Sequence, residues 1–149
     1  MFQRILLAWD GSEVALRAFD AAIDLTRRYD AELVAVSVAY SPAHAETAAD
    51  REETAQAAHR YLTGSFAEVA DRAHRAGVQV SHRIIRGDDP ARALLAHCHE
   101  HGFDLIVAGH HRSGRAGRLL LKGVVPALIE NGVPVLVVGD YEYGGARGA

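Results

Sequence analysis

Short apolar runs alternate with longer stretches of helical periodicity along the 149 residues of the chain. The apolar runs occupy residues 4–10, 32–40, 78–85, 103–109 and 133–139. Strands that alternate with helices indicate a parallel sheet wrapped on both faces by right-handed crossovers. We therefore predict a Rossmann-like α/β fold, with a five-stranded parallel sheet in the order 3-2-1-4-5 and helices on both faces. We expect one domain over residues 1–140, and a flexible C-terminal tail over the Gly-rich residues 141–149.

Capping residues mark where the helical stretches begin and end. Ser12 stands where the first helix needs an N-cap, and Asp89 does the same for the third. Gly102 follows the third helical stretch, as glycine often does after the last turn. The second stretch is long, Ala-rich and charged, from about residue 45 to 76, and Gly77 is its natural stop. These signals agree with the strand pattern, so the sequence predicts four helices between five strands.

Composition excludes several classes of protein. The formal net charge of −3 and the sequence pI near 6.3 argue against general binding to nucleic acid. No apolar run reaches the ~18 residues that a membrane-spanning helix requires, and the first residues lack the cleavage site of a signal peptide. The single cysteine, Cys98, cannot form an internal disulfide and suits a reducing compartment. We expect a cytoplasmic protein that has no nucleic-acid or membrane partner.

A glycine-rich, cationic loop follows the fourth apolar run. The stretch VAGHHRSGRAGRLLLKGVVPAL covers residues 107–128. Its glycines and cations are Gly109, Gly114, Gly117, Gly123, Arg112, Arg115, Arg118 and Lys122. In open α/β sheets, ligands bind beyond the carboxyl ends of the strands, where the strand order reverses. Asp10 and Gly109 end the first and fourth runs and would flank this switch point. The predicted topology therefore places the loop where a nucleotide would bind.

Three stretches of the chain resemble the universal stress protein family. They are RILLAWDGSEVALRAFDAAIDLTRRYDAELVAVSVA, GDDPARALLAHCHEHGFDLIVAGHH and GVPVLVV. The resemblance implies a Rossmann-like fold and a cytoplasmic role in the stress response. It also implies a homodimer formed through the last strand, here from Val133 to Val138.

The resemblance extends only partly to the nucleotide loop. Members that bind ATP resemble one another in a loop of the form Gly-x2-Gly-x9-Gly-Ser/Thr, whose backbone approaches the phosphates. When this form is aligned from Gly109, the second glycine becomes Arg112 and the Gly-Ser pair becomes Lys122-Gly123. The GHH at residues 109–111 is instead similar to the branch that does not bind ATP.

Other contacts implied by the resemblance are intact. Asp10 matches the carboxylate that approaches the ribose in members that bind ATP. Ala8 stands where the backbone lies against the adenine, and Val38 matches the strand position whose backbone bonds the adenine ring. The implied cofactor-binding set is therefore Ala8, Asp10, Val38, Gly109, Arg112, Gly114, Gly117, Lys122 and Gly123.

Two hypotheses about function stay open. In the first, the chain is a regulatory or protective stress protein without turnover, whose degraded loop is vestigial and whose protein partner is unknown. The missing second glycine and the missing Gly-Ser pair favour it. In the second, the chain is a switch that binds ATP or AMP, and side-chain cations replace the lost backbone donors. No cofactor beyond such a nucleotide is suggested.

Catalytic and metal sites are not predicted. Ser12 is explained as a helix cap and has no histidine base assigned to it. Asp10 lacks the second carboxylate, two residues on, that a metal-dependent phosphoryl transferase would carry. His97 and His101 share a helix face, but further ligands at metal-binding spacing are missing. Slow ATP hydrolysis therefore ranks last among the activities considered.

Overall fold

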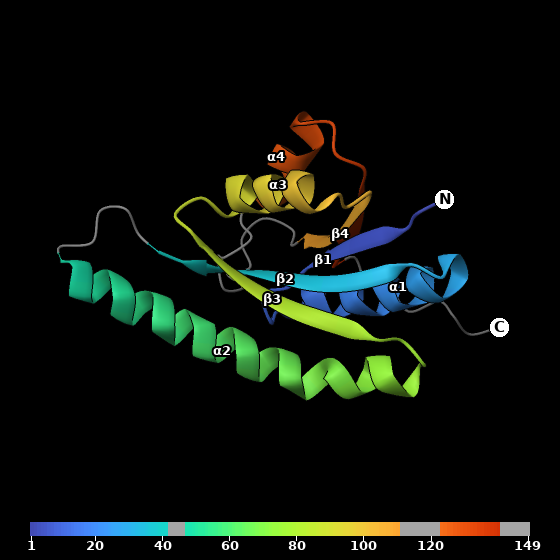
Figure 1. Ribbon diagram of the computed structural model, residues 1–149, viewed down its shortest axis with the longest axis horizontal. Coiled ribbons are helices and arrows are strands. Elements are labelled where there is room, and N and C mark those ends of the chain that lie inside the picture. Colours follow the sequence, from blue (N-terminus) through green and yellow to red (C-terminus); the bar gives the residue numbers. More distant parts are fainter. Residues whose placement is uncertain (42–46, 111–122, 141–149) are drawn as a thin grey trace.

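A computed structural model of the protein describes residues 1–41, 47–110 and 123–140 (Figure 1). The elements follow one another as β1 (Arg4–Ala8), α1 (Glu13–Tyr29), β2 (Glu32–Tyr40), α2 (Ala48–Arg75), β3 (Val80–Gly87), α3 (Pro90–His101), β4 (Leu105–His110), α4 (Val124–Glu130) and β5 (Val135–Gly139). The alternation predicted from the apolar runs is confirmed. The predicted tail, residues 141–149, lies outside the described residues.

The five strands form one parallel sheet in the order β3-β2-β1-β4-β5. This is the predicted order. The central strand β1 places Leu7 opposite Ala35 of β2 and opposite Val107 of β4. Nearly every residue of β1 and β2 is buried, because helices cover both faces of a parallel sheet.

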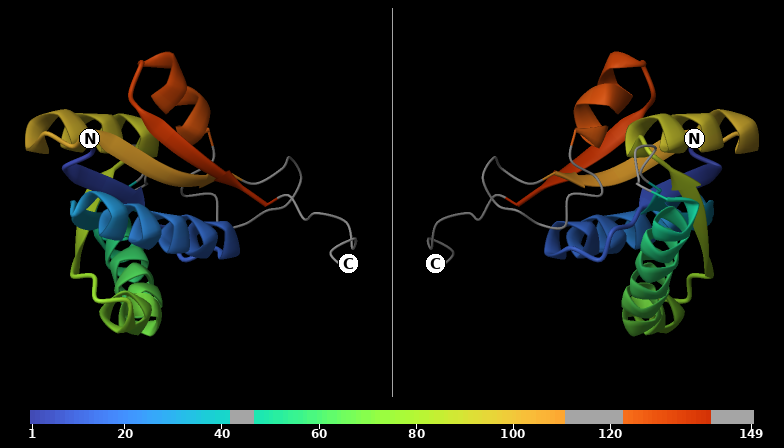
Figure 2. Two further views of the ribbon diagram at one scale, coloured as in Figure 1. Left: turned by 90° about the vertical axis from the view of Figure 1, so that its right-hand side faces the viewer. Right: turned by 90° about the vertical axis from the view of Figure 1, so that its left-hand side faces the viewer.

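Helices α1 and α2 cover one face of the sheet, and α3 and α4 cover the other (Figure 2). The core under α1 and α2 contains three aromatic side chains, Trp9, Phe19 and Phe66, which meet edge to face with centroids 6.0–6.1 Å apart. The core under α3 and α4 is mainly aliphatic and includes Leu94 and Leu128. The sheet therefore separates two cores of different character.

The helix ends agree with the capping signals. The Ser12 side chain accepts a hydrogen bond from the amide of Ala15, and Asp89 caps α3 in the same way. Gly102 ends α3 in the left-handed conformation, with φ 66°. The long helix begins at Ala48, about three residues later than predicted, because Thr47 is its N-cap. Among the described helices, none is long and apolar enough to cross a membrane.

Candidate functional site at the carboxyl ends of the strands

The strands separate at the carboxyl end of β1. Its pairing with β4 ends at Leu7, opposite Val107, whereas its pairing with β2 continues to Ala8, opposite Val36. The chain then leaves β1 toward α1, which covers one face of the sheet. This is the switch point predicted from the topology, and it brings Ala8, Asp10 and the end of β4 to one edge.

Asp10 is fixed in place by the turn that follows β1. Its Oδ1 accepts hydrogen bonds from the Ser12 amide at 2.9 Å and from the Ser12 hydroxyl at 2.6 Å. Ser12 Oγ also accepts from the Ala15 amide at 3.2 Å. Only 4% of Asp10 is exposed. Among the described residues, no hydrogen-bond donor contacts its second oxygen, Oδ2.

Val38 lies near the end of β2, opposite Ile85 of β3. Its side chain is buried in the core under α3 and α4. The contact of the Val38 backbone with an adenine ring, which the family resemblance implies, stays a prediction.

Gly109 has a structural reason to be glycine. A Cβ at this position would lie 2.7 Å from the carbonyl oxygen of Val14 and 2.9 Å from its Cγ1. Strand β4 therefore approaches the first turn of α1 too closely for any side chain. Because packing alone requires this glycine, its presence is no sign of a bound nucleotide.

The remaining predicted loop residues are placed only in part. Gly123 adopts a positive φ of 76° and precedes α4 as its N-cap residue, without a side-chain cap. The other predicted positions, Arg112, Gly114, Gly117 and Lys122, lie outside the described residues, as do Arg115 and Arg118. The phosphate half of the predicted site therefore stays a prediction.

Comparison with known families identifies the chain. The sequence model of the universal stress protein family matches residues 1–139. The chain belongs to this family. The universal stress protein YxiE of Bacillus subtilis is 28% identical over 153 aligned residues, which cover 93% of this chain and 99% of YxiE. The resemblance predicted from the sequence is confirmed, whereas the similarity of the GHH segment to the non-ATP-binding branch stays a prediction.

Solved universal stress proteins share this architecture. The universal stress protein UspA of Lactobacillus plantarum superposes with a TM-score of 0.79 at 21% identity, over 92% of this chain and 97% of that one. A universal stress protein solved in complex with cAMP gives a TM-score of 0.67 at 26% identity, over 92% and 97% of the two chains. The fold of this universal stress protein is thus the Rossmann-like fold of its relatives.

Polar residues surround Trp9 at the carboxyl end of β1. The sequence patterns did not predict them. The Ser37 hydroxyl donates to the carbonyl oxygen of Trp9 at 2.6 Å, and His82 Nε2 lies 2.8 Å from the same hydroxyl. The Trp9 indole donates to Ser65 Oγ at 3.1 Å. The available signal was a serine inside the otherwise apolar stretch LVAVSVA, residues 33–39. A buried serine in a strand needs a partner, but the sequence does not name it.

Burial governs the titration of His82. Desolvation, with a smaller contribution from the charge of His59, lowers its pKa to about 4. The His82 ring lies 4.4 Å from the ring of Phe66, tilted by 30°. His82 is therefore neutral at physiological pH.

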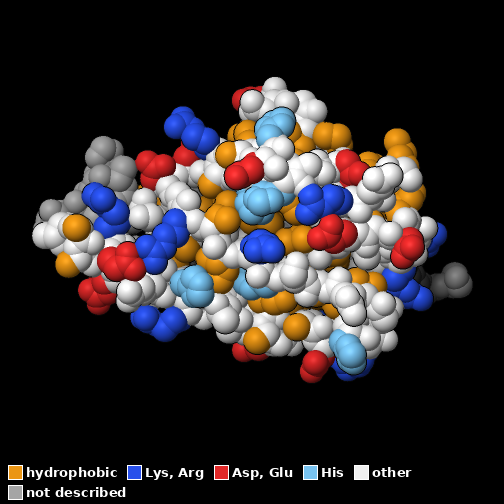
Figure 3. Space-filling view, in the orientation of Figure 1, with side chains coloured by type: hydrophobic (Ala, Val, Ile, Leu, Met, Phe, Trp, Pro, Cys, Tyr) orange, Lys and Arg blue, Asp and Glu red, His pale blue; other side chains and the backbone are white. Residues whose placement is uncertain are grey.

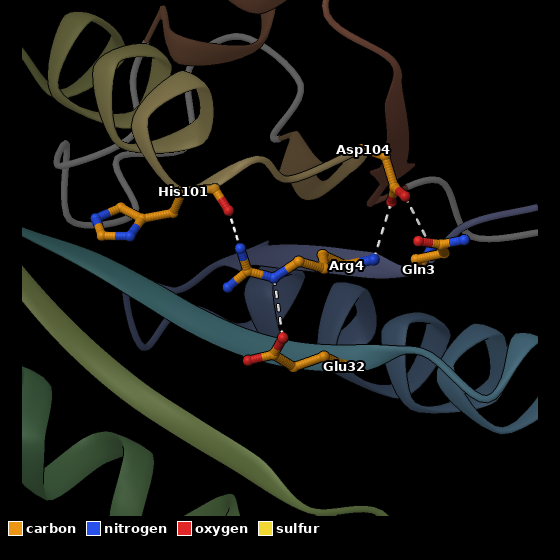
Figure 4. A network of polar contacts seen from close by, with 5 residues as sticks. All are labelled: Gln3, Arg4, Glu32, His101 and Asp104. Atoms are coloured by element: carbon orange, nitrogen blue, oxygen red, sulfur yellow. Dashed lines mark hydrogen bonds and ion pairs between the residues drawn. The ribbon is translucent and has the colours of Figure 1, made fainter.

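The histidine pair on α3 lies at the opposite edge of the universal stress protein. The rings of His97 and His101 are 4.2 Å apart, and within the described part of the chain no three potential ligands could hold a metal ion together. The His101 carbonyl oxygen accepts from Arg4, which also pairs with Glu32 at 2.9 Å (Figure 4). The Asp104 carboxylate accepts from two backbone amides at the start of β1. These contacts join the amino ends of β1, β2 and β4, so they explain this polar cluster structurally.

An open pocket of about 410 Å³ lies at the carboxyl ends of β2 and β3. Its lining residues are Ser41, Arg51, Arg86, Gly87 and Asp88. Arg86 donates through two nitrogens to the Glu52 carboxylate, at 2.7 and 2.9 Å. This bond lowers the pKa of Glu52 to about 2. The pocket contains none of the residues predicted from the sequence, and its arginine on β3 is engaged within the protein.

Proposed function

We propose that the protein is a regulatory universal stress protein that binds an adenine nucleotide at the switch point, without turnover. The observation that carries the proposal is the geometry of Asp10, whose Oδ1 is held by Ser12 while no described donor contacts Oδ2. A carboxylate oriented in this way suits a ribose hydroxyl, because hydrogen bonds to a charged acceptor are strong. The cAMP complex of a relative 26% identical to this chain supports the choice of ligand class.

The cationic loop is proposed to take the phosphates. Its four basic residues, Arg112, Arg115, Arg118 and Lys122, follow β4 along the sequence. A charge-assisted hydrogen bond contributes about 1.5–3 kcal/mol, so two placed cations would offset the loss of backbone donors. AMP and ATP are therefore the nucleotides that we expect to bind.

The structural role of Ser12 supports the proposed absence of turnover. Its hydroxyl donates to Asp10 and accepts from Ala15, as the cap of α1. We therefore assign it a structural task and propose a switch whose bound state regulates a protein partner. A cytoplasmic location is proposed with it, supported by the single cysteine, Cys98, which is free and buried.

Titration calorimetry with AMP, ATP and cAMP, on protein stripped of carried-over ligand, tests the proposal. We expect Asp10→Asn to weaken AMP binding by roughly tenfold to a hundredfold, because the amide removes the second carboxylate acceptor while leaving one for Ser12. Asp88→Asn, at the end of β3, is the matched control and should bind as the wild type does. Replacing Arg112 and Lys122 together by alanine should abolish the binding of ATP.

Two results would overturn the proposal. The first is no binding heat with any of the three nucleotides, although circular dichroism shows folded protein; the chain would then act through protein partners, with a vestigial loop. The second is Asp10→Asn binding as tightly as the wild type, which would remove Asp10 from the site.

A homodimer through β5 is the second part of the proposal. β5 is an edge strand whose residues Leu136 and Val137 are 38% and 37% exposed. An edge strand with unpaired backbone groups accepts a second copy readily. The dimer predicted over residues 133–138 would use this edge.

A further inference from the structure

The backbone ladder between β1 and β2 stops at Trp9. The Trp9 amide donates to the carbonyl oxygen of Val36 at 3.0 Å, and this is the last backbone hydrogen bond between the two segments in the described chain. The carbonyl oxygen of Trp9 instead accepts from the side chain of Ser37, at 2.6 Å. The Ser37 side chain thus occupies the carbonyl oxygen that would accept the next backbone hydrogen bond between the two segments.

The backbone group that would otherwise donate to the Trp9 carbonyl oxygen is the amide of Val38. Alternate residues of a strand direct their backbone groups to the same side. On β2, Glu32 donates to Gln3 ahead of β1 and Val36 accepts from Trp9, so even-numbered residues face β1. Ser41 donates to Gly87 of β3, so odd-numbered residues face the other way. The Val38 amide therefore points toward Trp9, yet it makes no backbone hydrogen bond to the Trp9 carbonyl.

His82 orients the Ser37 hydroxyl. A hydroxyl has one proton, and Ser37 gives it to the Trp9 carbonyl. The contact of 2.8 Å between Ser37 Oγ and His82 Nε2 therefore requires that Nε2 carry a proton and donate. Ser37 is fully buried, and Phe66 packs against the His82 ring. His82 of β3 therefore holds the Ser37 hydroxyl in one orientation.

We propose that Ser37, oriented by His82, is a positioning residue that keeps the Val38 amide available to the base of the nucleotide. A backbone N–H directed to this edge suits a ring nitrogen of adenine, which accepts a hydrogen bond. Without the Ser37 hydroxyl, the Trp9 carbonyl becomes free to accept from the Val38 amide. The backbone ladder between the two segments then gains one hydrogen bond. This inference rests on the proposed function for its ligand, and on the hydrogen bonds around Trp9 for its mechanism.

Amide hydrogen exchange of Val38, followed by NMR without ligand, tests the mechanism. In the wild type the Val38 amide should exchange faster than the Val36 amide. Ser37→Ala should slow Val38 exchange by roughly tenfold or more, because its amide gains a backbone acceptor. A merely disruptive substitution would speed exchange, so the direction of the change is diagnostic. Equal protection of Val36 and Val38 in the wild type, or no slowing in Ser37→Ala, would overturn the inference.

Matched variants separate Ser37 from a general disturbance of Trp9. Ser65→Ala removes the partner of the Trp9 indole but leaves its carbonyl untouched, so Val38 exchange should stay at the wild-type rate. His82→Gln keeps an N–H donor for Ser37 and should also leave Val38 unchanged, whereas His82→Leu should slow its exchange. Slowing in Ser65→Ala equal to that in Ser37→Ala would contradict a specific role for the hydroxyl.

Calorimetry with AMP then tests the ligand. Ser37→Ala should bind AMP roughly tenfold more weakly than the wild type, and Ser65→Ala within twofold of it. AMP should slow Val38 exchange in the wild type. If AMP binds wild type and Ser37→Ala equally, the role of Ser37 is wrong and the proposed function stands. If the wild type binds no AMP, the proposed function and the assigned ligand fall, whatever the exchange rates.

Discussion

The two edge strands of the sheet are protected to different degrees. β3 has the sequence VSHRIIRG and pairs with β2 along all eight of its residues. β5 has the sequence VLVVG, is five residues long and has no charged side chain. The face that shows β3 and α2 carries basic, acidic and histidine side chains mixed together (Figure 3). Charged residues on an edge strand discourage pairing with another chain. β3, the guarded edge, is therefore protected against such pairing, whereas β5, the apolar edge, is not.

The two edges also differ in what lies beneath them. Under β3, the ring of Phe66 packs on His82 and joins the aromatic cluster of Trp9 and Phe19. Under β5, Val138 packs against the same core and Val135 packs against the core under α3 and α4. The two edges therefore differ in the kind of support: an aromatic ring packs on β3, whereas aliphatic side chains anchor β5.

Removing the aromatic support of β3 should have the largest effect. Phe66→Ala should lower the free energy of unfolding by about 3–5 kcal/mol, because it deletes a buried ring and leaves a cavity. Val138→Ala, on the same face under β5, should cost about 1–2 kcal/mol. Urea denaturation of both variants, at a protein concentration that keeps the oligomeric state fixed, measures the difference. Equal costs would show that both edges are anchored alike.

A charge on the apolar edge should separate the proposed dimer. We expect Val137→Lys to raise the dimer dissociation constant by roughly a hundredfold or more, because an ammonium group would lose its hydration in the paired edge. Sedimentation velocity over a range of concentrations measures this. Val137 is a better position than Val135, whose side chain packs against the core under α3 and α4.

The guarded edge provides the control for that experiment. Arg83→Ala changes a charged residue of β3 and should leave the sedimentation coefficient as in the wild type. A mass unchanged by Val137→Lys would place the interface elsewhere or indicate a monomer. A mass changed by Arg83→Ala would reverse the comparison between the two edges.

The fold could be predicted from the sequence because its signals are local. Apolar runs, caps such as Asp89 and the αβ alternation each act over a few residues, and together they allow few topologies. The candidate site could be predicted only where it coincides with a strand end, as Asp10 does. The contact between Ser37 and His82 joins positions 45 residues apart, so it depends on the register of β2 against β3. The need for glycine at position 109 depends likewise on the approach of Val14 in α1.

Acid should weaken the guarded edge by a smaller amount. The pKa of His82 is about 4 in the folded protein, against 6.5 for the ordinary side chain. Between these values the unfolded chain binds more protons, so stability falls as the pH drops from about 6.5 to about 4. We expect a loss of roughly 1–2 kcal/mol, after discounting for the partial exposure of the ring. His82→Gln cannot take up this proton and should lose less stability over the same range.

Urea denaturation at pH 7.5, 5.5 and 4.5 measures this loss as the difference between the wild type and His82→Gln. Because burial also lowers the pKa of His97, the wild type alone would report both histidines, and the difference isolates His82. His74→Gln, at an exposed position on α2, should follow the wild type. The same pH dependence in wild type and His82→Gln would mean that the ring is hydrated in the folded state. β3 would then be held by Phe66 and the strand ladder without a contribution from the half-buried histidine.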